Sequence, residues 1–121
     1  MNAISRRMVA KKARRSKFNA VKRIIGGLRF DSIGESNRWL ILKADQRDGV
    51  ISNLRRQVEY PLLAWSEFGF VQIGIYKADF VYVRDGVEVT EDFKGCVTAE
   101  FRRTQKIFKA NYGKDILVTR K

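Results

Sequence analysis

A β-hairpin is predicted by residues 76–95, which have the sequence YKADFVYVRDGVEVTEDFKG. Asp85-Gly86 between alternating apolar and polar residues is a strong signal for a two-residue hairpin turn. Counting outward from that turn places Asp79 directly opposite Asp92 on the neighbouring strand. Residues 76–83 and 87–95 are therefore expected to form two antiparallel strands that bring these aspartates together.

Three charged side chains share one face of this predicted hairpin. Because strand side chains alternate between faces, Asp79, Asp92 and Lys94 point to one side and Glu91 points to the other. Paired side chains lie about 5 Å apart at Cβ, where two like charges are destabilising. Two carboxylates held that close favour a shared proton or a bound cation. The alternative is a solvated ion pair between Asp92 and Lys94 on an exposed strand face.

Two carboxylates beside a lysine are suited to metal-assisted hydrolysis of a phosphodiester. Carboxylate oxygens are hard ligands of the kind that Mg²⁺ and Mn²⁺ prefer. A bound cation would lower the pKa of a coordinated water and stabilise charge in the transition state. Lys94 would orient or deprotonate that water, or neutralise the scissile phosphate.

The charge of the chain is concentrated at its N-terminus. The 121 residues carry a net charge of +12, and residues 1–30 hold ten Lys or Arg and no acidic residue. We therefore expect a basic arm over residues 1–25 and one globular domain over residues 26–121. Such an arm suits nucleic acid, because each neutralised phosphate releases counterions. A solubilising tail is the alternative interpretation of the arm.

The composition excludes several kinds of site. Histidine is absent and Cys96 is the single cysteine, which rules out imidazole general bases, thiolate metal clusters and an internal disulfide. This cysteine usage favours a reducing compartment, so a cytoplasmic location is expected, in the host cell if the protein is encoded by a phage. No apolar run reaches about 18 residues, so no membrane span is expected. The basic start lacks the apolar region of a secretory signal, although it is also typical of mitochondrial transit peptides.

Two helices are predicted from their capping residues. Ser32 and Glu35 have the spacing of a capping box, and their helix is expected to run to about residue 48 and to end at Gly49. Thr98 is expected to cap a second helix over residues 99–112. Glu35 has two interpretations that are compatible: it closes the cap, and it directs a carboxylate toward the sheet.

Extended stretches complete the predicted fold. They cover residues 50–63, with Pro61 at a sheet edge or a strand end, residues 68–75, and residues 115–119. The order of helix, strands, helix and strand predicts an α/β fold with a mixed central sheet flanked by helices. Trp39, Trp65 and Cys96 are expected to be packing residues of the interior.

The predicted hairpin also resembles a known signature. Asp79-Phe80 followed by Glu91-Asp92-Phe93-Lys94-Gly95 resembles the motif of the PD-(D/E)xK nuclease superfamily, with Ala78 in place of the proline. Residues 27–35, GLRFDSIGE, are similar to the opening of a family of small phage proteins assigned to that superfamily. The likeness continues through residues 49–51, Leu54, Gln57, residues 76–82, residues 91–95, residues 106–108 and Tyr112-Gly113, and it covers about residues 18–121.

The resemblance implies a restriction-endonuclease-like core that binds Mg²⁺ or Mn²⁺ through Glu35, Asp79 and Asp92, with Lys94 catalytic. Gln57 and Glu91 are candidates for support of that site, and a purely structural amide is an alternative role for Gln57. The chain is also similar to phage Holliday-junction resolvases of the superfamily. That similarity implies a homodimeric endonuclease that cuts branched DNA in phage recombination, with no membrane partner.

Basic side chains are the candidate DNA contacts, and a solvated surface is their alternative role. They are Arg14, Arg15, Lys17, Lys22 and Arg23 near the N-terminus, and Arg102, Arg103, Lys106 and Lys109 on the second predicted helix. Basic charge alone would also fit a non-enzymatic nucleic-acid-binding protein, such as a packaging or ribosome-associated factor. A third interpretation is a nuclease fold that has become a regulatory subunit.

Overall fold

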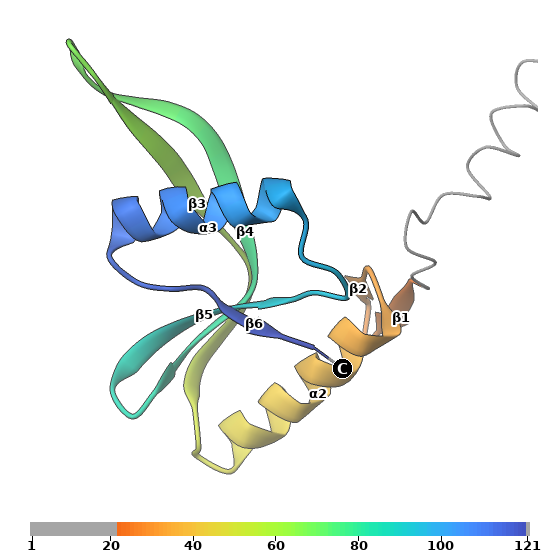
Figure 1. Cartoon of the computed structure of the whole chain (residues 1–121). Helices are drawn as coiled ribbons and strands as arrows, with labels where there is room; N and C mark the ends of the chain where they lie inside the picture. The colour runs from red at the N-terminus through yellow and green to blue at the C-terminus, as the bar shows by residue number, and fades with distance from the viewer. Residues whose placement is uncertain (1–21, 121) are drawn as a thin grey trace, which may run out of the picture. The chain divides into compact units, whose positions relative to one another are not determined.

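A computed structural model describes residues 22–120 of the chain (Figure 1). Within this range the chain forms two helices and six strands. It divides into two compact units, Met1–Ser36 and Asn37–Lys121. The predicted arm contacts Arg14, Arg15 and Lys17 lie outside the described residues.

The described part of the first unit is a short hairpin followed by the start of helix α2. Strands β1 (Arg23–Ile25) and β2 (Leu28–Phe30) pair antiparallel across Gly26-Gly27, whose φ angles are 55° and 82°. Glycine adopts these positive φ angles without strain, which explains why the tight turn falls at Gly26-Gly27. Strand β1 begins inside the segment 1–25 that was predicted to be an arm.

Both helices begin and end at the predicted caps. Helix α2 (Ile33–Arg47) starts after Ser32, whose Oγ accepts a hydrogen bond of 3.1 Å from the Glu35 amide. Helix α3 (Ala99–Tyr112) starts after Thr98, whose hydroxyl accepts the Phe101 amide at 3.1 Å. Gly113 ends α3 in the left-handed conformation that a helix C-terminus commonly requires.

The second unit is built on a mixed sheet with the strand order β3–β4–β5–β6. Strands β3 (Ser52–Ser66), β4 (Gly69–Arg84) and β5 (Val87–Phe93) are antiparallel, and β6 (Leu117–Thr119) runs parallel to β5 after the α3 crossover. The predicted mixed α/β architecture is therefore confirmed. The separate stretches predicted at 68–75 and 76–83 are wrong, because β4 is one strand of 16 residues.

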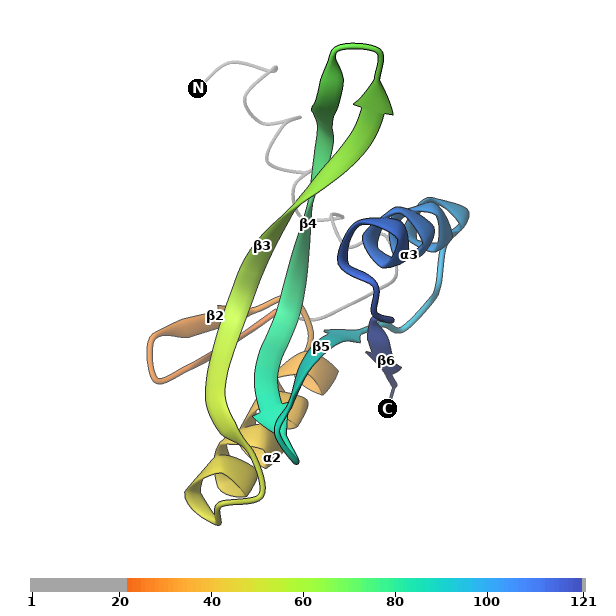
Figure 2. The ribbon, with the colours of Figure 1, turned by 90° about the vertical axis from the view of Figure 1, so that its left-hand side faces the viewer.

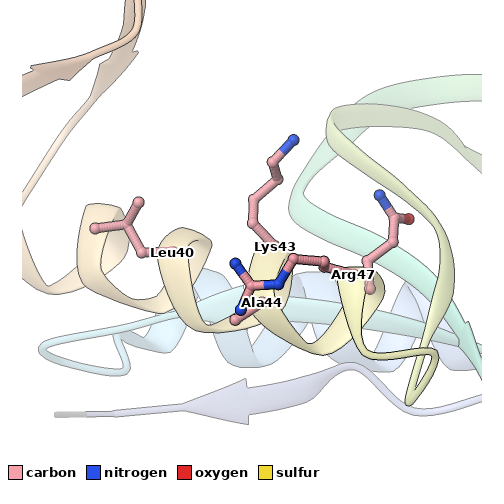
Figure 3. Close-up of a pocket in the computed structure, with 5 residues that line it drawn as sticks. Leu40, Lys43, Ala44 and Arg47 are labelled. Carbon is pink, nitrogen blue, oxygen red and sulfur yellow. The ribbon is translucent and has the colours of Figure 1, made fainter.

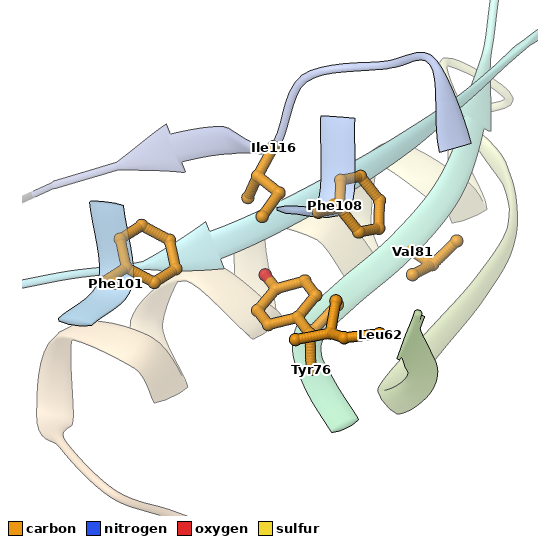
Figure 4. Packing of buried hydrophobic residues seen from close by; sticks show 7 residues of the cluster. Leu62, Tyr76, Val81, Phe101, Phe108 and Ile116 are labelled. Atoms are coloured by element: carbon orange, nitrogen blue, oxygen red, sulfur yellow. The ribbon is translucent and has the colours of Figure 1, made fainter. Parts of the chain in front are cut away.

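Two apolar clusters lie on opposite faces of this sheet. Phe101 and Phe108 of α3 pack in one cluster with Val81 of β4 (Figure 4). Leu42 of α2 packs in the other cluster, with Phe80 and Tyr82 of β4. Because neighbouring residues of a strand point to opposite faces, α3 and the second-unit part of α2 cover different faces of the sheet.

The β3–β4 hairpin extends past the end of α3 (Figure 2). Trp65 lies in this extension with 72% of its surface exposed, so the predicted core position of Trp65 is wrong. Its ring packs edge-on against Phe70 at 5.0 Å between centroids. Trp39, in contrast, is half-buried and stacks on Phe80, as expected for a packing residue. Pro61 lies within β3, which is an edge strand, so the edge interpretation is correct.

Candidate functional site

The register of β4 and β5 follows the turn at Asp85-Gly86. Both residues have the positive φ angles, 52° and 76°, that a two-residue turn of this kind requires. Pairing runs from Arg84 opposite Val87 to Phe80 opposite Glu91, as the turn predicted. Strand pairing ends there, so the predicted pairing of Asp79 with Asp92 is not part of the ladder: both aspartates lie one residue beyond its last pair, and Asp92 pairs with Val118 of β6 instead.

The side chain of Asp79 replaces strand pairing at this point. Its Oδ2 accepts a hydrogen bond of 2.9 Å from the backbone amide of Phe93, the residue after Asp92. Beyond Phe80, β5 no longer pairs with β4, while it pairs with β6 from Glu91 to Phe93. Asp79 therefore lies where two neighbouring strands diverge, and its carboxylate joins them.

Asp92 and Lys94 form the ion pair that their spacing predicted. Lys94 Nζ lies 2.9 Å from Asp92 Oδ2, and it also lies 4.5 Å from the centroid of the Phe101 ring. The pair differs from the solvated alternative because Asp92 is only 2% exposed. A buried carboxylate needs a nearby cation to offset its lost hydration, and Lys94 provides one.

Tyr76 of β4 is a buried tyrosine whose pKa is shifted by both aspartates. Its hydroxyl is buried, and among the described residues it makes no hydrogen bond of acceptable geometry (Figure 4). The pKa of Tyr76 is raised, first by burial and then by the negative charge of Asp92, with a smaller contribution from Asp79.

Glu91 points to the opposite face, as predicted, and it is fully buried. It accepts two hydrogen bonds from Arg38, at 2.7 and 2.9 Å, one of 2.6 Å from Tyr82 and one of 3.0 Å from Thr119. The pKa of Tyr82 is raised to about 12, mainly by burial and secondly by its hydrogen bond to Glu91. Glu91 therefore ties α2, β4 and β6 to the strand that carries Asp92.

Arg38 is a supporting residue that lies outside the predicted motif. Its hydrogen bonds to Glu91 raise the pKa of the Arg38 guanidinium. The signal for it lay in helix periodicity, because Arg38 is four residues before the buried Leu42 and so shares its face.

Gln57 borders Asp79 from the edge strand. Its Nε2 lies 3.5 Å from Asp79 Oδ1, which makes a long hydrogen bond. The backbone of Gln57 has φ 53°, a left-handed conformation that is uncommon for residues other than glycine, asparagine and aspartate. Strain of this kind is found preferentially at functional sites.

Glu35 belongs to the first unit, whereas Asp79, Asp92 and Lys94 belong to the second. Its side chain is 5% exposed, and its amide completes the cap of α2. Its predicted role as a third metal ligand stays a prediction. Within residues 22–120, no three Asp, Glu or Cys side chains form a group that could hold a metal ion.

The basic residues of α3 are mostly free to meet a ligand. Arg102, Arg103 and Lys106 are exposed, and Lys109 makes an exposed ion pair of 3.0 Å with Asp115. In the first unit, Lys22 and Arg23 are exposed. Cys96 is exposed as well, so its predicted packing role is wrong.

A hollow on the surface of α2 is separate from these residues. Leu40, Lys43, Ala44, Gln46 and Arg47 line it (Figure 3). It contains no carboxylate, so it offers none of the chemistry of the aspartate site. Among residues 22–120, neither helix has the length and apolar character needed to cross a membrane.

Comparison with known proteins gives one match. No curated protein and no solved structure matches the chain. A family model described as a protein of unknown function, DUF1064, matches residues 15–120. That range includes both helices, the whole mixed sheet and the aspartate pair, and the chain therefore belongs to the DUF1064 family.

Proposed function

We propose that the protein is a metal-dependent endonuclease with a restriction-endonuclease-like core, and that Asp79, Asp92 and Lys94 form its active site. The observation that carries the proposal is the Asp92–Lys94 pair at 2.9 Å, next to the point where Asp79 joins β4 to β5. A buried carboxylate, a half-buried carboxylate and an amine at a strand divergence have no evident need in a protein that only coats nucleic acid.

The donor set suits a hard divalent cation. Mg²⁺ is commonly bound through one or two carboxylates, with water and substrate phosphates completing its shell. Asp79 and Asp92 would hold Mg²⁺ or Mn²⁺, which supplies charge stabilisation at the phosphate and an activated water. Asp79 is half-buried and Asp92 is buried, so Asp79 is the more accessible of the two carboxylates.

Lys94 is the residue proposed to act on the reacting groups. Its Nζ is held between Asp92 and the Phe101 ring, and a third of its surface is exposed. An ammonium in that position would neutralise the scissile phosphate or orient the attacking water. Arg102, Arg103 and Lys106 on α3 would bind flanking phosphates, since Phe101 of the same helix contacts Lys94.

The proposed substrate is branched DNA, such as a four-way junction, in phage recombination. It rests on the resemblance to phage resolvases and on the basic charge of the chain. Cleavage of a four-way junction and of a linear duplex should be measured with and without Mg²⁺, for wild type and Asp92→Asn. We expect Asp92→Asn to slow cleavage by roughly 10²-fold or more, the loss typical of removing a group that stabilises transition-state charge.

Asp85→Asn is the matched control. It removes the same charge from the same hairpin, at a turn position where asparagine is well tolerated. It should cut as fast as wild type. Equal cleavage by Asp92→Asn and wild type would show that this site is not catalytic.

A non-enzymatic nucleic-acid-binding protein is the second candidate. It is favoured by the exposed basic face of α3 and by the lack of a three-carboxylate group among residues 22–120. In that case neither Mg²⁺ nor Mn²⁺ would bind in calorimetry. Asp92→Asn would then bind DNA at least as tightly as wild type, because a repulsive charge is removed, and no variant would cut it.

A further inference from the structure

The extension of the β3–β4 hairpin carries a surface of large apolar side chains. Phe68 is 91% exposed, and the other members are between 55% and 72% exposed. We call this set the hairpin patch, and it consists of Trp65, Phe68, Phe70, Ile73 and Ile75. Single exposed apolar residues are ordinary in proteins, but a contiguous group on one element marks an interaction surface.

Trp65, Phe70 and Ile75 lie on the face of the hairpin that α3 does not cover, and Phe68 lies in the turn at its tip. Tyr60, Leu62 and Tyr76 pack against α3, so their strand neighbours point the other way. Ile75 is paired with Pro61, and Phe70 with Trp65, on that other face. A register shift after Leu62 leaves Ile73 as the extra residue between them.

Part of the outer edge of β3 is already bonded to α3, at Pro61 and Leu63. Asn111 of α3 accepts the Leu63 amide at 2.7 Å and donates to the Leu63 carbonyl at 3.0 Å. The Tyr112 hydroxyl donates to the Pro61 carbonyl at 2.7 Å. Because these edge groups already have partners, a binding partner would dock on the face of the hairpin instead of extending the sheet.

The absence of charge on the patch limits what can cover it. Between Tyr60 and Tyr76 the single charged residue is Glu67, in a chain with a net charge of +12. The patch therefore has no attraction for phosphate. Two copies of so basic a chain repel each other over most of their surface, and a neutral apolar face is where they can approach without that cost.

We infer that the hairpin patch is the interface of a two-fold homodimer, in which two copies of the patch bury each other. Three aromatic rings, each able to bury roughly 150–250 Å², and two isoleucines bring the patch to the order of the ~800 Å² per partner of a stable interface. A self-complementary face of this kind suits an isologous dimer. The inference concerns assembly and holds whether or not the aspartate site cuts DNA.

Sedimentation of the full chain without nucleic acid tests the inference. Wild type should dimerise with a dissociation constant of ~1 µM or lower, within the range of interfaces of this size. Phe70→Glu should weaken the dimer by about 100-fold or more, because it places a charge at the centre of the apolar contact. Val87→Glu is the control, since Val87 is 63% exposed at the other hairpin turn, and it should dimerise like wild type.

A second variant separates loss of the interface from loss of the fold. Leu63 and Gln72 are cross-strand partners, so Asn-Gly can replace residues 64–71 as a two-residue turn. The shortened protein should be monomeric with an unchanged circular dichroism spectrum. In a Trp39→Phe background, the emission of Trp65 should shift to the blue as the wild-type hairpin dimerises.

Three results would overturn the inference. The first is a wild type that stays monomeric at about 100 µM, far above the expected dissociation constant. The second is a Phe70→Glu variant that dimerises as tightly as wild type. The third is a monomeric wild type that floats with phosphatidylcholine vesicles, together with a Phe70→Glu variant that does not. That result would show that the patch binds a lipid surface.

Discussion

The carboxylate of Asp79 accepts the backbone amide of Phe93 at 2.9 Å, one residue beyond Asp92. One side chain thus holds two strands together at the place where their backbone pairing ends. The same carboxylate is proposed to bind the metal ion. Structural and chemical roles therefore coincide at Asp79, and variants must be chosen to separate them.

Asp79→Asn and Asp79→Ala should differ in stability but not in activity. Asparagine retains an oxygen that can accept a hydrogen bond from the Phe93 amide. Alanine leaves that amide without an acceptor, which should lower the free energy of unfolding by about 1–3 kcal/mol. Both changes remove the negative charge, so both should abolish cleavage. Urea unfolding and junction cleavage measured on the same samples check this. Full activity in Asp79→Asn would contradict the proposed ligand role.

Glu91→Gln should be strongly destabilising. The change leaves Arg38 and its partners without the buried carboxylate that accepts four hydrogen bonds. Breaking a buried ion pair typically costs 3–5 kcal/mol, and partial exposure of Arg38 places the expectation at the lower end. Thermal or urea unfolding measures the loss, with Glu59→Gln, at an exposed position of β3, as control. A loss under about 1 kcal/mol, the value typical of exposed pairs, would contradict this role.

Gln57→Gly should separate backbone strain from function. Glycine accepts the φ of 53° without the penalty that glutamine carries, so stability should stay equal or rise by up to about 1 kcal/mol. Gln57→Val, a β-branched residue, should be destabilised at the same position. If the side chain supports Asp79, Gln57→Gly will cut more slowly although it is no less stable. Unchanged cleavage would show that the side-chain amide of Gln57 does not contribute to the site.

Glu88→Gln should have a small, pH-dependent effect on stability. Hydrogen bonding to Lys114, at 2.8 Å, lowers the pKa of Glu88 in the folded state below its usual 4.5. Because the pKa of Glu88 is lower in the folded state than in the unfolded state, its ionised form stabilises the fold at any pH above the unfolded-state pKa. This contribution is lost as the pH falls through the folded-state pKa. The difference from wild type should therefore be present at pH 7 and shrink below pH 4.5.

The size of that effect is limited because Glu88 is 45% exposed, and exposed pairs contribute less than about 1 kcal/mol. Unfolding free energies measured across the acid range give the comparison. A difference that is constant from pH 7 to pH 3 would show that the effect of the substitution is not electrostatic.

The salt dependence of DNA binding tests the basic face of α3. Replacing Arg102 and Arg103 together by Gln should reduce the slope of log K against log salt by about 2, close to 0.9 for each lost phosphate contact. Arg47→Gln, on the last turn of α2, is the control and should leave the slope unchanged. An unaltered slope in the double variant would place the DNA elsewhere on the protein.

Local signals determined the helices and the central turn. Ser32, Thr98 and the glycines after each helix act through hydrogen bonds within a few residues, so their effect is readable without tertiary context. Asp85-Gly86 set the β4–β5 register for the same reason, and the Asp92–Lys94 ion pair followed from strand alternation alone.

Tertiary contacts decided the rest. The length of β4, the exposure of Trp65 and the arginine that satisfies Glu91 depend on which elements meet across the sheet. The sequence of a hydrophobic side chain does not show whether a helix covers it, and the structure shows that Trp65, Phe70 and Ile75 lie on the hairpin face opposite α3. The sequence by itself therefore determined the helix caps, the hairpin turn and the Asp92–Lys94 ion pair. The burial of Asp92 and the divergence of β4 and β5 at Asp79 required the tertiary structure, because they arise from contacts between residues far apart in the chain.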